Sequence, residues 1–221
     1  VDAKYNDSIV PFIDIDISGN AIYKNRIIML DILNNNNWKR PIYFSPGSFA
    51  DDDYLWMKDY LQLDGMVYKL VPIRTAIPKD GSPLDMGQID SDKMYDIVMK
   101  WDWGNGELTS IYHDPETRKN SISYRSVLSR LMDKLIAEGK LDKAKKVIDL
   151  ALSKMPMDYY GYYTMVEPYA GGYYEVGEKA KARQLLERLM TKYKQNLKYF
   201  AGIQPSIQSG IASDIITDIE R

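Results

Sequence analysis

The pattern of apolar and polar residues changes period several times in the first third of the chain. In the second part of the segment Ile9–Ile17, isoleucines alternate with aspartates, which is typical of a β-strand with one buried face. The next segment has apolar residues at helical spacing. Short apolar runs bounded by Pro, Gly and Asn come after it. In chain order, the pattern predicts a strand over Ile9–Ile17, a helix over Ala21–Leu33, a strand over Pro41–Ser45, a helix over Asp51–Leu61 and a strand over Val67–Ile73.

The order of these elements predicts a small β-α-β-α-β unit of the α/β or α+β class, with a parallel or mixed sheet. A loop rich in Pro, Gly and Asp follows at Lys79–Met86, and a short helix is expected over Asp92–Trp101. From there to residue 120 the sequence is typical of turns and loops. We therefore predict an N-terminal α/β unit over residues 1–120 and an α-helical unit over residues 121–221.

The helical unit contains two copies of one pattern, which is typical of tetratricopeptide repeats. In such repeats a small residue marks the helix crossing, a Gly makes the turn, and a Pro ends the second helix. The first copy has Leu128, Leu131, Leu135, Gly139, Ala144, Ile148, Ala151 and Pro156, and the second has Val166, Tyr169, Ala170, Tyr173, Gly177, Ala182, Leu186 and Leu189. The two copies are offset by 38 residues from Ala144 to Ala182, which places an insertion in Met157–Tyr162. Because about three repeats are needed for a stable array, we expect the pair to dock on the N-terminal unit or on a helix near Ile207–Ile219.

Composition removes several classes of function. Lys and Arg number 29 against 31 Asp and Glu, and the resulting net charge of −2 argues against a nucleic-acid partner. The chain has no Cys and a single His, which excludes thiol chemistry and any multi-histidine metal site. No apolar run approaches the roughly 18 residues of a membrane span. We expect no cofactor.

Two segments of the N-terminal unit carry candidate ligand-binding residues. Asp14 and Asp16 share one face of the first predicted strand, a spacing that suits a divalent cation or an acid–base pair. The plainer interpretation is a solvent-facing strand surface. Trp38 and Arg40 precede the second predicted strand and could bind a sugar or a phosphate. The Trp38 ring would stack on the ligand, and the Arg40 guanidinium would donate two parallel hydrogen bonds. Their alternative role is to anchor the fold.

Two further segments lie near the predicted boundary between the units. Trp101, Asp102 and Trp103 place two indole rings beside a carboxylate, which is a pattern suited to sugars, although packing at a helix end explains it as well. His113 is followed by Asp114, which could orient it as a general base. No nucleophile is paired with His113 by any motif.

Tyrosines gather in and after the predicted insertion. The chain has 18 Tyr against 4 Phe, and seven of the tyrosines lie between residues 159 and 174. The concave face of a helical repeat array commonly binds peptides. We therefore predict a partner groove at Tyr160, Tyr163, Tyr169 and Tyr173, with the alternative that these rings fill the core between the repeats.

Several short motifs in a fixed order resemble one protein family. They are NNNNWKRPIYF at Asn34–Phe44, LDGMVYKLVPI at Leu63–Ile73, Met94-Tyr95-Asp96, Trp103-Gly104-Asn105, Tyr112-His113-Asp114 and Ser123-Tyr124-Arg125. Together they resemble the C-terminal soluble part of a multi-pass membrane protein family of the Bacteroidetes, which is similar to the animal protein O-mannosyltransferases. The resemblance covers about Ala21–Leu189, and its most specific block includes Trp38 and Arg40.

The resemblance implies a parent protein with a glycosyltransferase-like membrane domain upstream of Val1, and a position of this domain on the periplasmic side of the inner membrane. The catalytic acid of such enzymes lies in the upstream part, so no catalytic residue is assigned here. We expect a non-catalytic domain that binds a protein or glycoprotein acceptor and its own upstream membrane domain. The alternatives are a carbohydrate-binding module and a free-standing hydrolase that uses Asp14, Asp16 or His113.

Overall fold

The chain forms two compact units in the computed structural model, Val1–Trp101 and Asp102–Arg221. The structure describes residues 3–15, 17, 21–45, 52–75, 86–203, 212 and 216. The boundary lies earlier than the predicted one at residue 120. The reason is that the loop 102–113 bonds to the helical unit, as described below. None of the helices in the described ranges is both long and apolar enough to cross a membrane.

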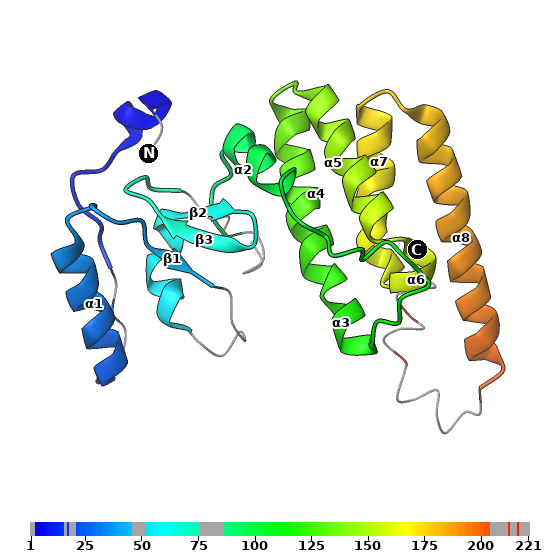
Figure 1. Cartoon of the computed structure of the whole chain (residues 1–221), viewed down its shortest axis with the longest axis horizontal. Helices are drawn as coiled ribbons and strands as arrows, with labels where there is room; N and C mark the ends of the chain where they lie inside the picture. Colours follow the sequence, from blue (N-terminus) through cyan, green and yellow to red (C-terminus); the bar gives the residue numbers. More distant parts are fainter. Residues whose placement is uncertain are drawn as a thin grey trace. The chain divides into compact units, whose positions relative to one another are not determined.

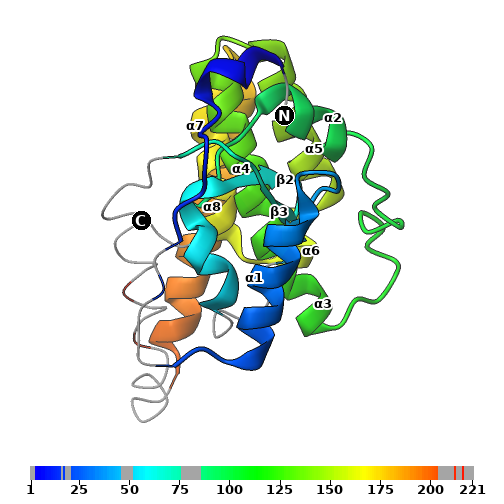
Figure 2. The same ribbon diagram turned by 90° about the vertical axis from the view of Figure 1, so that its left-hand side faces the viewer.

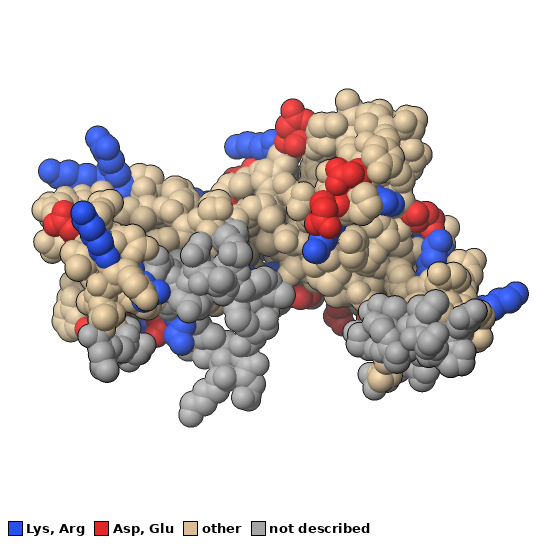
Figure 3. Space-filling model, turned by 90° about the horizontal axis from the view of Figure 1, so that it is seen from below, with Lys and Arg blue, Asp and Glu red and all other residues tan. Residues whose placement is uncertain are grey.

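Unit 1 is built around a small antiparallel sheet (Figures 1 and 2). Its strands β1 (Tyr43–Phe44), β2 (Leu61–Asp64) and β3 (Val67–Leu70) have the spatial order β1-β3-β2. Buried Leu61, Leu63 and Leu70 join Met57 and Met94 in the core. The other elements of the unit are η1 (Ala3–Ser8), α1 (Lys24–Asn36), η2 (Asp52–Tyr60) and α2 (Ser91–Val98). Lys and Arg side chains project from the part of the unit that carries α1 (Figure 3).

The sheet differs from the predicted β-α-β-α-β unit. The strand predicted over Ile9–Ile17 is reduced to one bridge between Ile9 and Ile73, since Pro11 has no N–H to donate to a ladder. The strand β2 was not predicted. It pairs with β3 through a turn at Gly65, whose φ is +67°. A two-residue turn can join only antiparallel strands, so this connection excludes the expected parallel arrangement here.

Unit 2 consists of two helical hairpins. The helices α4 (Ser121–Ala137) and α5 (Leu141–Lys154) form the first, and α7 (Glu167–Glu175) and α8 (Lys179–Ala201) form the second. The short elements α3 (Pro115–Lys119), α6 (Met157–Tyr160) and η4 (Tyr163–Val166) connect them. Gly139 and Gly177 make the turns within the hairpins with φ of +72° and +85°, as the sequence predicts. The small residues Ala144 and Ala182 are fully buried.

The hairpins meet at a glycine in α7, which packs against both α4 and α5. A Cβ atom built on Gly172 would lie under 3.0 Å from the sulfur of Met132 and 3.1 Å from Ile148. The neighbouring Gly171 has no atom within 4 Å of the same position. Gly172 therefore sets how closely the second hairpin approaches the first.

A buried arginine holds the predicted insertion. Arg125 of α4 is 0% exposed, and its guanidinium donates to the carbonyl oxygens of Met155 at 2.9 Å, Gly161 at 2.6 Å and Tyr162 at 3.1 Å. Burial lowers the pKa of Arg125 to about 10. The side chain therefore remains protonated at neutral pH. One cation therefore donates to three carbonyls of the connection between α5 and η4, and the carbonyl of Tyr162 also accepts from the amide of Met165 at 3.0 Å.

Paired substitutions at the two glycines test the helix contact. Gly172→Ala should lower the free energy of unfolding by about 1–2 kcal/mol, because overpacking outweighs the better helix propensity of Ala. Gly171→Ala, one residue away, should leave it unchanged or raise it by up to about 1 kcal/mol. Urea unfolding followed by circular dichroism at 222 nm measures both. Equal values for the two variants would contradict the contact.

Replacement of Arg125 tests its hold on the insertion. Arg125→Met should lower the free energy of unfolding by about 3–5 kcal/mol, because the buried carbonyl of Met155 and the partly buried carbonyls of Gly161 and Tyr162 lose a charged donor. Arg125→Lys should recover only part of this loss, since a single ammonium does not reproduce the planar fork. Arg183 is exposed on α8, and Arg183→Met is the matched control. The same urea titration checks all three, and an Arg125→Met variant as stable as the control would refute the role.

Candidate functional site

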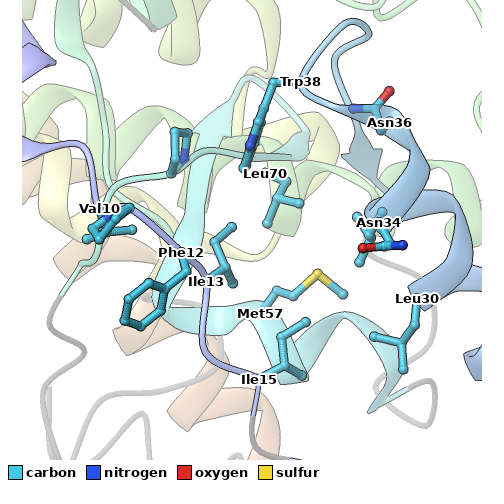
Figure 4. Close-up of a pocket in the computed structure, with 13 residues that line it drawn as sticks. Val10, Phe12, Ile13, Ile15, Leu30, Asn34, Asn36, Trp38, Met57 and Leu70 are labelled. Atoms are coloured by element: carbon cyan, nitrogen blue, oxygen red, sulfur yellow. The ribbon is translucent and has the colours of Figure 1, made fainter.

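One candidate site among the described residues is an apolar pocket in unit 1 (Figure 4). Its volume is about 280 Å³, which suits one or two side chains or a small ring. It lies between the N-terminal segment, the inner face of α1 and the residues around η2 and β3. The lining residues are Val10, Pro11, Phe12, Ile13, Ile15, Leu30, Leu33, Asn34, Asn36, Trp38, Met57, Leu70 and Pro72.

Trp38 stands at this pocket because of an uncommon backbone conformation. Asn37 and Trp38 have φ of +47° and +57°, the left-handed region that bulky residues rarely adopt. The turn is held by the Lys39 amide, which donates to the Asn36 carbonyl at 2.9 Å, and by the Asn36 side-chain amide, which donates to the Arg40 carbonyl at 2.8 Å. The Trp38 side chain nevertheless remains 56% exposed. A strained residue that keeps a large ring exposed is typical of functional sites.

The lining determines what this pocket can accommodate. Most of it is aliphatic, and Figure 4 shows Leu30, Ile13 and Met57 around the same space. Its side-chain amides are those of Asn34 and Asn36, and the latter already donates a hydrogen bond. Such a pocket favours an apolar group with few hydrogen-bonding atoms. Arg40, predicted as a partner of Trp38, is exposed and is absent from the lining.

Trp101 and Trp103 belong to different units, and each has contacts within its own unit. Trp101 belongs to unit 1, where a Cβ on Gly65 would lie 3.2 Å from its ring. Asp102 belongs to unit 2, and its carboxylate accepts from the amide of Gly104 at 3.0 Å. The ring of Trp103 contacts Tyr124, with 5.6 Å between the centroids. Each residue therefore has a local structural role.

The predicted acid–base residues are engaged elsewhere or isolated. Asp114 caps α3, where its carboxylate accepts from the amides of Glu116 and Thr117 at 3.0 Å, so it does not orient His113. The His113 ring packs against Tyr159 and Tyr160. Asp14 is exposed, and Asp16 lies outside the described residues. In the described part of the chain, no three His, Asp or Glu residues are placed to hold a metal ion.

The tyrosines predicted to form a partner groove are instead structural ties, and two of them correct that prediction outright. Tyr169 is 0% exposed and donates to the carbonyl of Arg125 at 2.6 Å. Tyr173 is also buried and donates to Asp149 at 2.7 Å. The half-buried Tyr160 donates to the carbonyl of Gly106 at 2.7 Å, while the hydroxyl of Tyr163 accepts from Asn196. Buried rings with bonded hydroxyls cannot line an open groove.

Sequence reasoning missed most of the pocket and the residues that position the insertion. The pocket includes Phe12, Leu30 and Met57, which lie far apart in the chain and share no motif. The hydroxyl of Tyr159 accepts from the amide of His113 at 2.8 Å and donates to the carbonyl of Ile111 at 2.5 Å. The sequence did contain one indication of these contacts. The predicted insertion includes two adjacent tyrosines, Tyr159 and Tyr160, whose hydroxyl groups require hydrogen-bond partners when they are partly buried.

Fold and site together define a two-unit α+β protein whose N-terminal unit carries an apolar pocket beside an exposed tryptophan. Residues 1–93 of the chain match a family model described as TMEM260-associated domain 2. The match includes the whole pocket and less than half of the chain. TMEM260 is an animal protein O-mannosyltransferase. No curated protein and no solved structure matches the chain.

The contact between Tyr173 and Asp149 makes the stability of unit 2 depend on pH. Burial acts to raise the pKa of Asp149, but hydrogen bonds from Lys181 and Tyr173 outweigh it and hold the pKa below its usual range. A carboxyl with a depressed pKa stabilises the fold above its unfolded pKa of about 3.9, and this contribution is lost as the pH falls through the folded pKa. Asp149→Asn should therefore be less stable than the wild type at neutral pH, and the difference should shrink below about pH 4.

Urea unfolding at a series of pH values checks this prediction. Glu187→Gln is a suitable control, because Glu187 is exposed on α8 and forms no ion pair with the described residues. A constant difference between Asp149→Asn and the wild type across the acid range would contradict the prediction.

Proposed function

We propose that this chain is a non-catalytic accessory domain of a membrane-embedded glycosyltransferase-like protein, and that it binds a polypeptide through the apolar pocket of unit 1. The observation that carries the proposal is the pocket around Trp38, which lies inside the residues that match TMEM260-associated domain 2. The polypeptide would be an acceptor protein or another partner of the parent enzyme. The proposed location is the periplasmic side of the inner membrane.

The lining favours a polypeptide over a sugar. A sugar ring carries hydroxyl groups on every side, and each hydroxyl that is buried without a partner costs free energy. A Leu, Ile, Met or Phe side chain has no such requirement and fills a volume of this size. The exposed edge of Trp38 can then cover the neighbouring backbone of the bound segment, as aromatic rings do at protein interfaces.

The helical unit supports this function as a scaffold. We assign its hairpins to two tetratricopeptide-type units, separated by the insertion that contains α6. Most of the slots predicted for the repeat hold buried residues, among them Leu128, Leu135 and Leu189, whereas Leu186 is exposed; the two turn glycines have positive φ. Its tyrosines stabilise the unit and leave partner binding to unit 1.

A carbohydrate is the second candidate ligand, because the exposed ring of Trp38 and the side-chain amide of Asn34 line the same pocket. A stacked sugar would contact the ring face without entering the aliphatic part of the pocket. The two candidates therefore differ in how strongly they depend on Leu30, which points into the pocket in Figure 4.

Selection of a random peptide library on the immobilised chain tests the polypeptide. Selected peptides should share an apolar anchor residue, and replacing that anchor by Ala should weaken binding at least about tenfold, as for a buried hot spot. Leu30→Trp fills the pocket and should weaken binding of the same peptides at least about tenfold. Fluorescence anisotropy of labelled peptides measures each affinity.

Ile32→Trp provides the matched control, since Ile32 lies on the same helix, is exposed and does not line the pocket. It should bind the peptides as the wild type does. No shared anchor among the selected peptides, or unchanged binding by Leu30→Trp, would refute the pocket as the site. Binding on a glycan array that Trp38→Ala abolishes and Leu30→Trp preserves would establish the carbohydrate instead.

A further inference from the structure

One face of the small sheet in unit 1 is polar across its three strands (Figure 1). Residues that lie directly opposite each other on paired strands point to the same face. Tyr43 of β1 lies opposite Lys69 of β3, and Lys69 lies opposite Gln62 of β2. Beyond β2, Gln88 forms a parallel bridge with Gln62. The pairing therefore places a tyrosine, a lysine and two glutamines in one row, whereas the buried leucines of β2 and β3 occupy the other face.

A carboxylate is buried beside this polar row. Asp64 lies two residues after Gln62 on β2, shares its face and is 5% exposed. The Oδ1 atom of Asp64 accepts from the side-chain amide of Gln62 at 2.6 Å. Its Oδ2 atom is buried and accepts no hydrogen bond from a described residue, and the ammonium of Lys93 is 3.9 Å away. A buried carboxylate oxygen without a donor costs free energy unless a bound molecule supplies one.

Two ammonium groups meet beside this carboxylate. Lys93 of α2 forms the ion pair with Asp64, and its side chain also lies next to that of Lys69. Burial and repulsion from Lys93 lower the pKa of Lys69. The nearby acid Asp90, which caps α2, is already paired with Lys4 at 2.9 Å. Two cations beside one carboxylate leave an excess of positive charge, and an anion between the two ammonium groups would relieve their repulsion.

A further buried group in the row also lacks a partner. The Nε2 atom of Gln88 is buried and donates to no described residue. The site therefore combines one acceptor, Asp64 Oδ2, with several donors. Tyr43 is 48% exposed, and the side chain of Lys93 is 43% exposed, so the row is open to solvent. A matching anion must accept several hydrogen bonds and donate one.

We propose that the polar face of the sheet binds a phosphate group in its hydrogen phosphate form. The protonated oxygen donates to Asp64 Oδ2, and the other oxygens accept from the ammonium groups of Lys69 and Lys93. Sulfate has the same shape but carries no proton to donate, so Asp64 discriminates against it. The proposal does not rest on the pocket of the proposed function, because none of these residues lines that pocket.

A titration followed by ¹H–¹⁵N NMR tests the proposal on the intact chain. At about pH 6 a large fraction of phosphate groups carries a proton. Inorganic phosphate should then bind saturably and at least about tenfold more tightly than sulfate, with the ionic strength held constant by sodium chloride. The signals of the side-chain amides of Gln62 and Gln88 should shift during the titration.

Glycerol 3-phosphate distinguishes the two sources of the phosphate group under the same conditions. Tighter binding than that of inorganic phosphate assigns the site to a phosphate ester. Equal or weaker binding assigns it to free phosphate.

Substitutions separate the roles of the carboxylate and the lysine. Asp64→Asn should lower the ratio of phosphate affinity to sulfate affinity from at least about tenfold to about one or below, because an amide donates where the carboxylate accepts. Lys69→Gln should weaken phosphate binding at least about tenfold, since it removes a charge-assisted hydrogen bond. Lys24→Gln is the matched control, because Lys24 is exposed at the start of α1 and lies outside the row. It should bind phosphate as the wild type does.

Circular dichroism establishes that each variant is folded, and Lys69→Gln, at a half-buried position, keeps the test decisive if Asp64→Asn does not fold. The pocket variant Leu30→Trp should retain phosphate binding, which separates this proposal from the proposed function.

Three outcomes overturn the proposal. The wild type shows no saturable binding of phosphate, it binds sulfate as tightly as phosphate, or folded Lys69→Gln binds phosphate as the wild type does. If Asp64 has only a structural role, Asp64→Asn changes the stability of the chain and leaves the ratio of the two affinities unchanged, and this result also contradicts the proposal.

Discussion

A single buried guanidinium determines how the helical unit is assembled. Burying a cation without an acidic partner is costly, and it is tolerated where strong acceptors surround the charge. Arg125 meets this requirement with the carbonyls of Met155, Gly161 and Tyr162, and its own carbonyl accepts from Tyr169. The first hairpin, the insertion and the second hairpin therefore share one polar centre. These hydrogen bonds constrain the spacing between the helices on either side of Arg125.

The insertion in turn holds the loop of residues 102–113 in place by hydrogen bonds. Fixed by Arg125, it presents the hydroxyls of Tyr159 and Tyr160 to the backbone of residues 106–113, while Lys154 pairs with Glu107 at 2.6 Å. A stretch with little regular structure thereby becomes part of unit 2. This explains why the unit begins at Asp102, well before its first long helix. It also explains why the hydroxyl groups of Tyr159 and Tyr160 form hydrogen bonds within the unit and do not face a ligand site.

Local patterns predicted the helical unit well and the sheet poorly. Gly139 and Gly177 adopt the turn conformations that their spacing indicates, and the segment Met157–Tyr162 lies between the two helical hairpins. The β2–β3 hairpin had a turn signal in Asp64-Gly65, which lies just before the predicted strand Val67–Ile73 and was not used in the prediction. The pocket had none, since Ile13, Leu30 and Met57 come together only through tertiary packing. The burial of Tyr169 could not be predicted from composition, because a tyrosine-rich segment has the same composition whether its rings are buried or exposed.

The left-handed pair Asn37 and Trp38 has a consequence for the energetics of recognition. Two such residues cost on the order of 1–3 kcal/mol each, which is met during folding by the hydrogen bonds of the surrounding turn. The turn therefore sets the direction in which the Trp38 side chain leaves the backbone before any ligand arrives, and association does not have to pay for ordering this turn. Affinity at this site then depends on how well the shape of the ligand fits the pocket. Most of the conformational entropy lost on binding is that of the ligand. A rigid segment with the same apolar anchor would bind more tightly than a flexible one.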